Sequence, residues 1–199
     1  MIALKDSLGT EFVERVRIIF SEDGLLSKMI AQGMLVTDPK VGKEAVPVAT
    51  TRPVTSLIDF DLDTPLAASA AHFGHLLMAY AAAKSALQFR PIKSVVGAAS
   101  RRRARTQTRP CASRAELDQV RGLVGAFVYL RPLFFTARQA CLLDSLTLLN
   151  FLAHYRIFPE WVFGVKANPF YAHCWVQQAD VVLNDTPDFV RGFTPILVI

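Results

Sequence analysis

The chain has 199 residues, which is long enough for one domain or two small ones. Hydrophobic residues make up 52% of it and charged residues 20%, which excludes intrinsic disorder for most of the chain. Three cysteines, an odd number, argue against a secreted disulfide framework, and the charged first twenty residues do not fit a signal peptide. We therefore expect a protein of the reducing cytoplasm.

The net charge of +5 is concentrated in one segment. Residues 84–121 carry ten basic and two acidic residues, centred on the run Arg101-Arg102-Arg103-Ala104-Arg105. Such a run favours a solvated linker or helix face, and a nucleic-acid interface is the alternative. No aromatic residue is interleaved with the arginines to stack on bases, so we expect no nucleic-acid partner.

The N-terminal quarter predicts a small module. Thr10 to Phe20 has the spacing of an amphipathic helix, and a second helix is expected over 21–33, ended by Gly33. A short strand follows at 34–36. We interpret residues 1–45 as a remnant of a winged-helix-like domain, and the proline-containing segment 46–64 as a linker or extended arm.

A long uncharged run, Pro65 to Ala83, begins the larger part of the chain at 65–199. Its length alone would permit a membrane span. Its many alanines and its two histidines, His72 and His75, favour a soluble helix over 65–88 instead, so we expect no stable membrane insertion.

In the rest of the chain, predicted helices come first and predicted strands follow them. Residues 91–110 are basic and irregular, with a further helix start and a loop, and Ser113 with Glu116 forms a capping box for a helix that runs to about Leu130. A helix is predicted over 136–155. It is followed by strands at 161–165, 171–177 and 181–185, with a turn at 168–169. One helix followed by an antiparallel meander is an α+β pattern.

Three residues of this C-terminal part carry a possible chemistry: Cys141, His173 and Asp185. Cys141 is expected in the first or second turn of its helix, where the helix dipole favours the nucleophilic thiolate. A cysteine nucleophile needs an imidazole to accept and return its proton, and the imidazole needs a third group that fixes its tautomer.

Strand pairing predicts which carboxylate serves the histidine. With a three-residue loop at 178–180, Gln177 pairs with Val181, and the same register places His173 directly opposite Asp185. A two-residue loop would instead pair His173 with Thr186, so the prediction depends on the loop length.

Taken singly, each of the three residues has a more ordinary interpretation: a small buried apolar cysteine, a hydrogen-bonded strand histidine and a turn aspartate. Their combination indicates a nucleophilic site. Cys174 is a poor rival, because on a strand it points to the face opposite His173. Cys111 has no partner nearby in sequence. His72 and His75 could share a metal, but a packed or exposed pair is favoured and we predict no metal site.

The sequence resembles the lasso-peptide biosynthesis B protein, a transglutaminase-like cysteine peptidase of the microcin-maturation type. The resemblance covers about Arg131 to Ile199 strongly and 65–130 more weakly. It is carried by Ala140 to Leu146 (ACLLDSL), Phe163-Gly164-Val165, Asn168 to Val176 (NPFYAHCWV) and Val182 to Asp185 (VLND). It implies a transglutaminase/papain-like C-terminal domain, in which a catalytic helix packs on an antiparallel sheet, at 65–199.

The resemblance implies that Cys141 is the nucleophile, His173 the general base and acid, and Asp185 the orienting carboxylate. The implied reaction removes the leader from a lasso-peptide precursor, so that a partner cyclase related to asparagine synthetase can close the isopeptide ring. No cofactor is implied for this chain. The alternatives are an amine-accepting acyltransferase with the same triad and a non-catalytic scaffold for the precursor. The backbone N–H of Cys141 and Gln139 are candidate oxyanion donors.

The N-terminal part departs from the family. Members with a fused leader-recognition domain begin with about three strands and three helices. Only Thr10 to Val36 has a plausible counterpart here, and Met1 to Gly9 leaves room for one strand. We therefore expect an incomplete leader-recognition domain and weak leader binding by this chain.

Overall fold

The computed structural model describes most of the C-terminal three quarters of the chain and two short strands before it. The described residues are 2–3, 43–44, 48, 50–58, 70–106, 114–135, 141–167 and 170–199. They divide between two compact units, Met1–Pro47 and Val48–Ile199. The boundary between the units falls inside the predicted linker at 46–64, and the domain assignment stays a prediction.

In the first unit, β1 (Ile2–Ala3) pairs in parallel with β2 (Lys43–Glu44). The helices predicted at 10–20 and 21–33 and the strand predicted at 34–36 lie outside the described residues.

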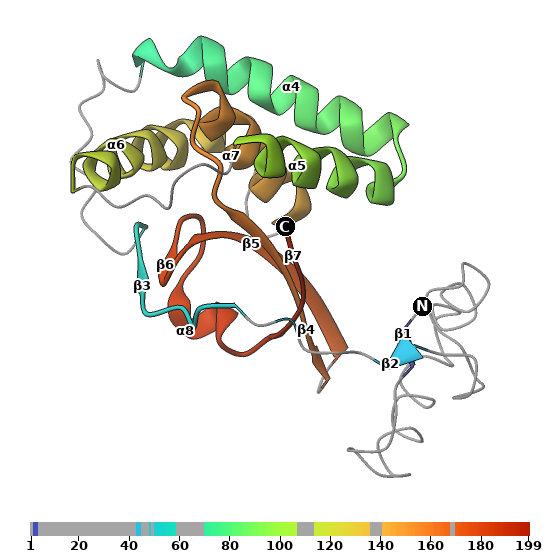
Figure 1. The fold of residues 1–199 in the computed structure, drawn as a ribbon. Helices are drawn as coiled ribbons and strands as arrows, with labels where there is room; N and C mark the ends of the chain where they lie inside the picture. Colours follow the sequence, from blue (N-terminus) through green and yellow to red (C-terminus); the bar gives the residue numbers. More distant parts are fainter. Residues whose placement is uncertain are drawn as a thin grey trace. The chain divides into compact units, whose positions relative to one another are not determined.

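The second unit is an α+β fold built on a five-stranded sheet (Figure 1), and it confirms the predicted fold class. In spatial order its strands are β3 (Thr55–Ser56), β6 (Val181–Val182), β5 (Phe170–Gln178), β4 (Glu160–Ala167) and β7 (Thr194–Val198). All neighbours are antiparallel except β3 and β6, so the sheet is mixed and not purely antiparallel as predicted. The parallel strand belongs to the predicted linker. Thr55–Ser56 is part of the sheet because its backbone pairs with the edge strand β6.

Four helices cover one face of this sheet: α4 (Phe73–Phe89), α5 (Ile92–Thr106), α6 (Arg114–Leu130) and α7 (Cys141–His154). A 3₁₀ turn, η1 (Arg131–Leu133), follows α6. The main core lies between these helices and the sheet, and its largest fully buried side chains include Leu76, Phe127, Leu148, Phe151 and Trp161. The opposite face carries a smaller core of Val162, Trp175 and Val182, covered by Phe193 and by Val190 of α8 (Pro187–Val190).

The helix predictions are confirmed where periodicity was strong. The helix expected over 65–88 is found from Phe73 to Phe89, and α6 begins directly after Ser113 and ends at Leu130. The predicted hydroxyl cap of Ser113 lies outside the described residues. The helix start predicted within 91–110 is found at Ile92, but the irregular conformation predicted for that segment is wrong over 92–106, because α5 is a continuous helix there. Val95 and its apolar neighbours pack it on the core, an effect that the charge pattern hides.

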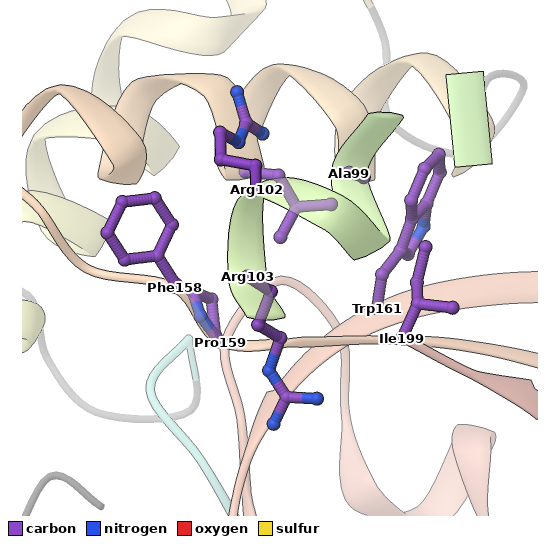
Figure 2. A pocket seen from close by; sticks show the side chains of 8 residues that line it. Ala99, Arg102, Arg103, Phe158, Pro159, Trp161 and Ile199 are labelled. Atoms are coloured by element: carbon purple, nitrogen blue, oxygen red, sulfur yellow. The ribbon is translucent and has the colours of Figure 1, made fainter. Parts of the chain in front are cut away.

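The arginine run lies at the end of α5, where its central residues are used inside the fold. Arg103 forms an ion pair of 3.0 Å with Glu160, and Arg102 donates a hydrogen bond of 3.1 Å to Asn150. Figure 2 shows these two arginines beside a pocket, which is also lined by Ala99, Leu149, Phe158, Pro159, Trp161 and Ile199. None of the three predicted site residues lines it.

Over the described residues, no helix combines the length and the apolar character that crossing a membrane requires.

Candidate active site

The sheet and its longest hairpin place His173. In β5, alternate residues face opposite sides: Cys174 and Val176 enter the main core under the helices, whereas Trp175 enters the smaller core. The His173 ring lies on the side of the smaller core, where it stacks on Trp175 and contacts Phe193. Its Nε2 atom lies 2.7 Å from Oδ2 of Asp185. The predicted pairing of these two side chains is therefore present in the structure.

The hairpin register beside Asp185 and His173 differs from the predicted one. Gln177 pairs with Val182 and Gln178 with Val181, so the loop has two residues, Ala179 and Asp180, and the predicted three-residue loop is wrong. Ala179 has a φ of 54°, the left-handed conformation that such tight turns use. The strand predicted over 181–185 ends at Val182.

Side-chain hydrogen bonds replace the missing strand at Asp185. Oδ1 of Asn184 accepts the Val176 N–H at 2.8 Å, where a ladder carbonyl would otherwise bond. Oδ1 of Asp185 accepts the Thr186 N–H at 2.8 Å and bends the chain toward α8. Asp185 thus meets His173 from a bend beyond the strand end and not from a paired strand position.

Cys141 is the first residue of α7 in the described part of the chain and is partly exposed. A hydrogen bond from the Cys174 side chain, together with attraction to His173, outweighs burial and lowers the pKa of the Cys141 thiol to about 4. The positive end of the helix dipole favours the same thiolate form. The hydrogen bond to the Cys141 sulfur, together with burial, raises the pKa of Cys174, so the buried thiol stays protonated.

The pKa of the His173 imidazole is shifted upward, in the direction opposite to that of Cys141. Burial by itself would lower its pKa, but the hydrogen bond to Asp185 and the attraction to Cys141 raise the pKa of His173 to about 9. Its Nδ1 atom is buried and has no hydrogen-bond partner among the described residues. Because Asp185 holds Nε2, Nδ1 is the nitrogen left to exchange a proton with Cys141 or a substrate.

An aromatic wall encloses the histidine. Phe189 of α8 lies edge-on to the His173 ring at 5.1 Å between centroids, and Phe193 lies at 5.3 Å. Tyr171 stacks on the same ring from the preceding alternate position of β5. These side chains shield the imidazole, which is 9% exposed, whereas the Asp185 side chain is 22% exposed, and this partial shielding strengthens the bond between the two.

Sequence reasoning missed a buried polar cluster beside these residues. Asp144 on α7 receives hydrogen bonds from Arg131 at 3.1 Å and from the Asn184 amide at 2.6 Å. Asp144 is 2% and Asn184 7% exposed. The available signal was an acidic residue in a leucine-rich helix, three positions after the cysteine, together with an asparagine directly before the aspartate.

Of the other candidates named from the sequence, Cys174 lies at this arrangement, His72 and His75 lie apart from it, and two lie outside the described residues. Cys174 faces away from the His173 ring, as strand parity predicts, but it is 3% exposed and lies against Cys141 under α7. His72 and His75 both hydrogen-bond through Nδ1 to the Tyr155 hydroxyl, at 2.6 and 2.8 Å. Cys111 and Gln139 lie outside the described residues.

The pKa values of the pair predict an unusual reactivity of Cys141. Its alkylation by iodoacetamide, followed residue by residue with peptide mass spectrometry, is expected to lose half its rate only near pH 4, where the thiolate is protonated. The same cysteine in a denatured sample is the control and is expected to titrate at about pH 8.5, as free thiols do. A midpoint in the folded protein close to that of the denatured control would contradict the lowered pKa of Cys141.

Gly164 predicts a steric effect at the site. It pairs with His173 across β4 and β5, and a Cβ atom added there would lie 2.8 Å from Cβ of Phe193 and 2.9 Å from the Trp175 ring. We expect Gly164→Ala to lower the free energy of unfolding by about 1–3 kcal/mol, measured by urea denaturation. Gly122→Ala is the matched control: apart from its chain neighbours and the adjacent backbone of its own helix, no atom lies within 4 Å of the added Cβ, and alanine favours the helix there. Equal stability of the two variants would show that the sheet yields at Gly164.

The comparison with protein families agrees with this geometry. A profile described as the transglutaminase-like superfamily matches residues 83–198, more than half of the chain. The chain therefore belongs to the transglutaminase-like superfamily, and the match includes all three predicted site residues. The resemblance found in the sequence is thus confirmed at the level of the superfamily. Comparison with curated proteins and with solved structures gave no significant match.

Proposed function

We propose that this protein is a cysteine peptidase in which Cys141 is the nucleophile, His173 the general base and acid, and Asp185 the residue that orients the imidazole. The observation that carries the proposal is the His173 ring itself, held by Asp185 at 2.7 Å through Nε2 and with Nδ1 unpartnered beside a low-pKa cysteine. Membership of a superfamily of transglutaminase-like proteins supports the same chemistry.

The proposed reaction has two acyl-transfer steps. The Cys141 thiolate attacks the peptide carbonyl, and the amine leaves with the proton that Nδ1 of His173 gives it, so that a thioester forms. Water then attacks the thioester while Nδ1 takes its proton. The carboxylic acid leaves, and the thiolate and imidazolium are restored. Asp185 keeps the ring in one orientation throughout and stabilises its charged form.

As substrate, we propose the leader region of a lasso-peptide precursor. The support is the resemblance of Arg131 to Ile199 to the lasso-peptide biosynthesis B protein, carried by the residues around Cys141, His173 and Asp185. Cleavage after the last leader residue frees an α-amine on the core peptide. An asparagine-synthetase-like cyclase, the proposed partner in the cytoplasm, would join that amine to an acidic side chain.

An acyltransferase of the same class is the second candidate, because superfamily membership fits it equally. Both candidates form the same thioester and differ in the acceptor, water or an amine. A non-catalytic scaffold that binds the precursor is a third and predicts no thioester.

The experiment that tests these candidates incubates the protein with its precursor peptide and a small primary amine, and weighs all products. The peptidase yields the free leader acid and the free core peptide, with little amine adduct. A leader that carries the amine as an amide would favour the acyltransferase, and an unchanged precursor would favour the scaffold.

A further inference from the structure

A chain of buried and partly buried hydrogen bonds links the segments that carry the three proposed catalytic residues. Nη1 of Arg131 donates to Oδ1 of Asp144 at 3.1 Å. The other carboxylate oxygen of Asp144 accepts the Asn184 side-chain N–H at 2.6 Å. Oδ1 of Asn184 in turn accepts the backbone N–H of Val176 at 2.8 Å. We call these three side chains, Arg131, Asp144 and Asn184, the clamp.

Each segment joined by the clamp holds one residue of the site within a few positions. Asp144 lies three residues after Cys141 on α7, Val176 lies three residues after His173 on β5, and Asn184 directly precedes Asp185. Ser145 adds a second tie between the same helix and strand: its hydroxyl donates to the Cys174 carbonyl at 3.1 Å and accepts from Asn184 at 3.2 Å. Helix, strand and bend are therefore fixed to one another at the site.

Because the polar side chains of this cluster are buried, they hold helix, strand and bend in one particular arrangement. Asp144 is 2%, Ser145 0% and Asn184 7% exposed, so each polar atom of the cluster must find its partner inside the protein. Apolar side chains of similar volume would fill the same space but would fix the bend at Asp185 less firmly. Strand pairing ends at Val182, and beyond it the Leu183 N–H bonds to the Val176 carbonyl at 2.9 Å and the Ser56 hydroxyl to the Asp185 carbonyl at 2.6 Å. Asn184 supplies one acceptor to the sheet and two donors to the helix, to Asp144 and to Ser145, and a side-chain amide offers this set of one acceptor and two donors at one position.

We infer that the clamp positions Asp185 on His173, with Asn184 as the residue that sets the distance between the bend, the strand and the helix of Cys141. This inference rests on the proposed function for its catalytic meaning. Asn184, Asp144 and Arg131 act through Asp185 and do not touch the reacting atoms, so they are positioning residues.

The pH profile of Cys141 alkylation by iodoacetamide tests the inference without the peptidase reaction. We expect Asn184→Ala to loosen the Asp185–His173 pair and to raise the pH at which the Cys141 thiolate forms. Each pH unit of that rise lowers the alkylation rate on the acid side about tenfold. Asn150→Ala is the matched control, because Asn150 also lies on α7 and bonds to Arg102 and to the Ala79 carbonyl, away from the bend. Its profile is expected to stay that of the unaltered protein.

Exchanging the amide of Asn184 and the carboxylate of Asp144 distinguishes a positioning role of the clamp from a general loss of folding. Asn184→Asp alone places two carboxylates against each other and is expected to shift the profile strongly or to unfold the chain. The double variant with Asp144→Asn restores one amide and one carboxylate in the same pair, so Arg131 and Val176 keep acceptors. We expect it to fold and to recover most of the profile. A double variant no better than Asn184→Asp, or a folded Asn184→Ala with the profile of Asn150→Ala, would overturn the inference.

The result stays distinct from that of the peptidase proposal. If no precursor is cleaved but the exchange rescues the alkylation profile, the clamp stands and the proposed reaction fails. If cleavage occurs and the profile is indifferent to the clamp, the reaction stands and the inference fails.

Discussion

Cys141→Ala is expected to abolish leader removal, whereas Cys174→Ala keeps most of it. Cys141 is partly exposed at the start of α7 and has the lowered pKa of a nucleophile, while Cys174 is buried beneath it with a raised pKa. Loss of a nucleophile that forms the covalent intermediate costs on the order of 10⁶ in kcat in a comparable serine enzyme. Mass spectrometry of the precursor after incubation measures the effect.

Cys174→Ala provides the matched control, because it removes a sulfur that contacts the same site. Its side chain stabilises the Cys141 thiolate, so we expect the acid limb of activity to move to higher pH. At neutral pH, His173 still supports the thiolate, and most of the rate remains. Cys111→Ala is expected to leave cleavage unchanged. Robust cleavage by the Cys141→Ala protein would remove Cys141 from the mechanism.

The sequence predicted those parts of the fold that are determined by hydrophobic periodicity and by capping or turn residues. Leu130 ends α6 as predicted, and the strands at 161–165 and 171–177 are found within β4 and β5. In these segments local patterns and tertiary burial agree, so the local pattern is sufficient. The conformation of the segment after Pro91 was mispredicted because its many charges suggested an irregular, solvated segment. Val95 is buried and Arg102 and Arg103 are half-buried, so packing on the core determines its helical conformation.

The hairpin shows why a correct contact can follow from a wrong register. The expected loop at 178–180 is shortened to Ala179 and Asp180. The Gln177 amide, which would have flanked the loop, donates to the carbonyls of Thr51 and Ala179 and is fully buried. Thr51 lies 126 residues away in the chain, and no local pattern includes it. The register is therefore a tertiary property, and pattern reasoning about the hairpin alone could not find it.

The same limit applies to the polar cluster under the site. Asp144 occupies a position on α7 where the pattern calls for an apolar residue, and its partners Arg131 and Asn184 come from other elements. Burial raises the pKa of its carboxyl, and the Arg131 charge and the Asn184 amide oppose that shift. A conflict between local pattern and burial of this kind is expected where a fold serves a site.

Asp185→Asn is expected to preserve the fold and to lose much of the cleavage rate. Oδ2 of Asp185 accepts from Nε2 of His173 at 2.7 Å, and this bond is the main contribution that raises the pKa of His173 against the effect of burial. An amide at this position removes the negative charge, and its N–H group can hold the ring in the tautomer that has a proton on Nδ1. That ring cannot accept the proton of a thiol or of water at Nδ1. In a serine triad the equivalent change costs about 10⁴ in kcat.

The pH dependence of the rate distinguishes loss of orientation from a general loss of structure. In the unaltered protein, activity needs the thiolate and the charged imidazole, so it rises near pH 4 and falls near pH 9. Without the Asp185 charge, the pKa of His173 drops, and the alkaline limb of the residual activity moves to lower pH. Asp180→Asn is the matched control, since the carbonyl of Asp180, not its side chain, bonds Val54 and Thr55. Because asparagine suits a turn as well as aspartate, that variant is expected to keep its rate and both limbs of the profile. Equal losses in the two variants would show that Asp185 acts through the bend and not through the imidazole.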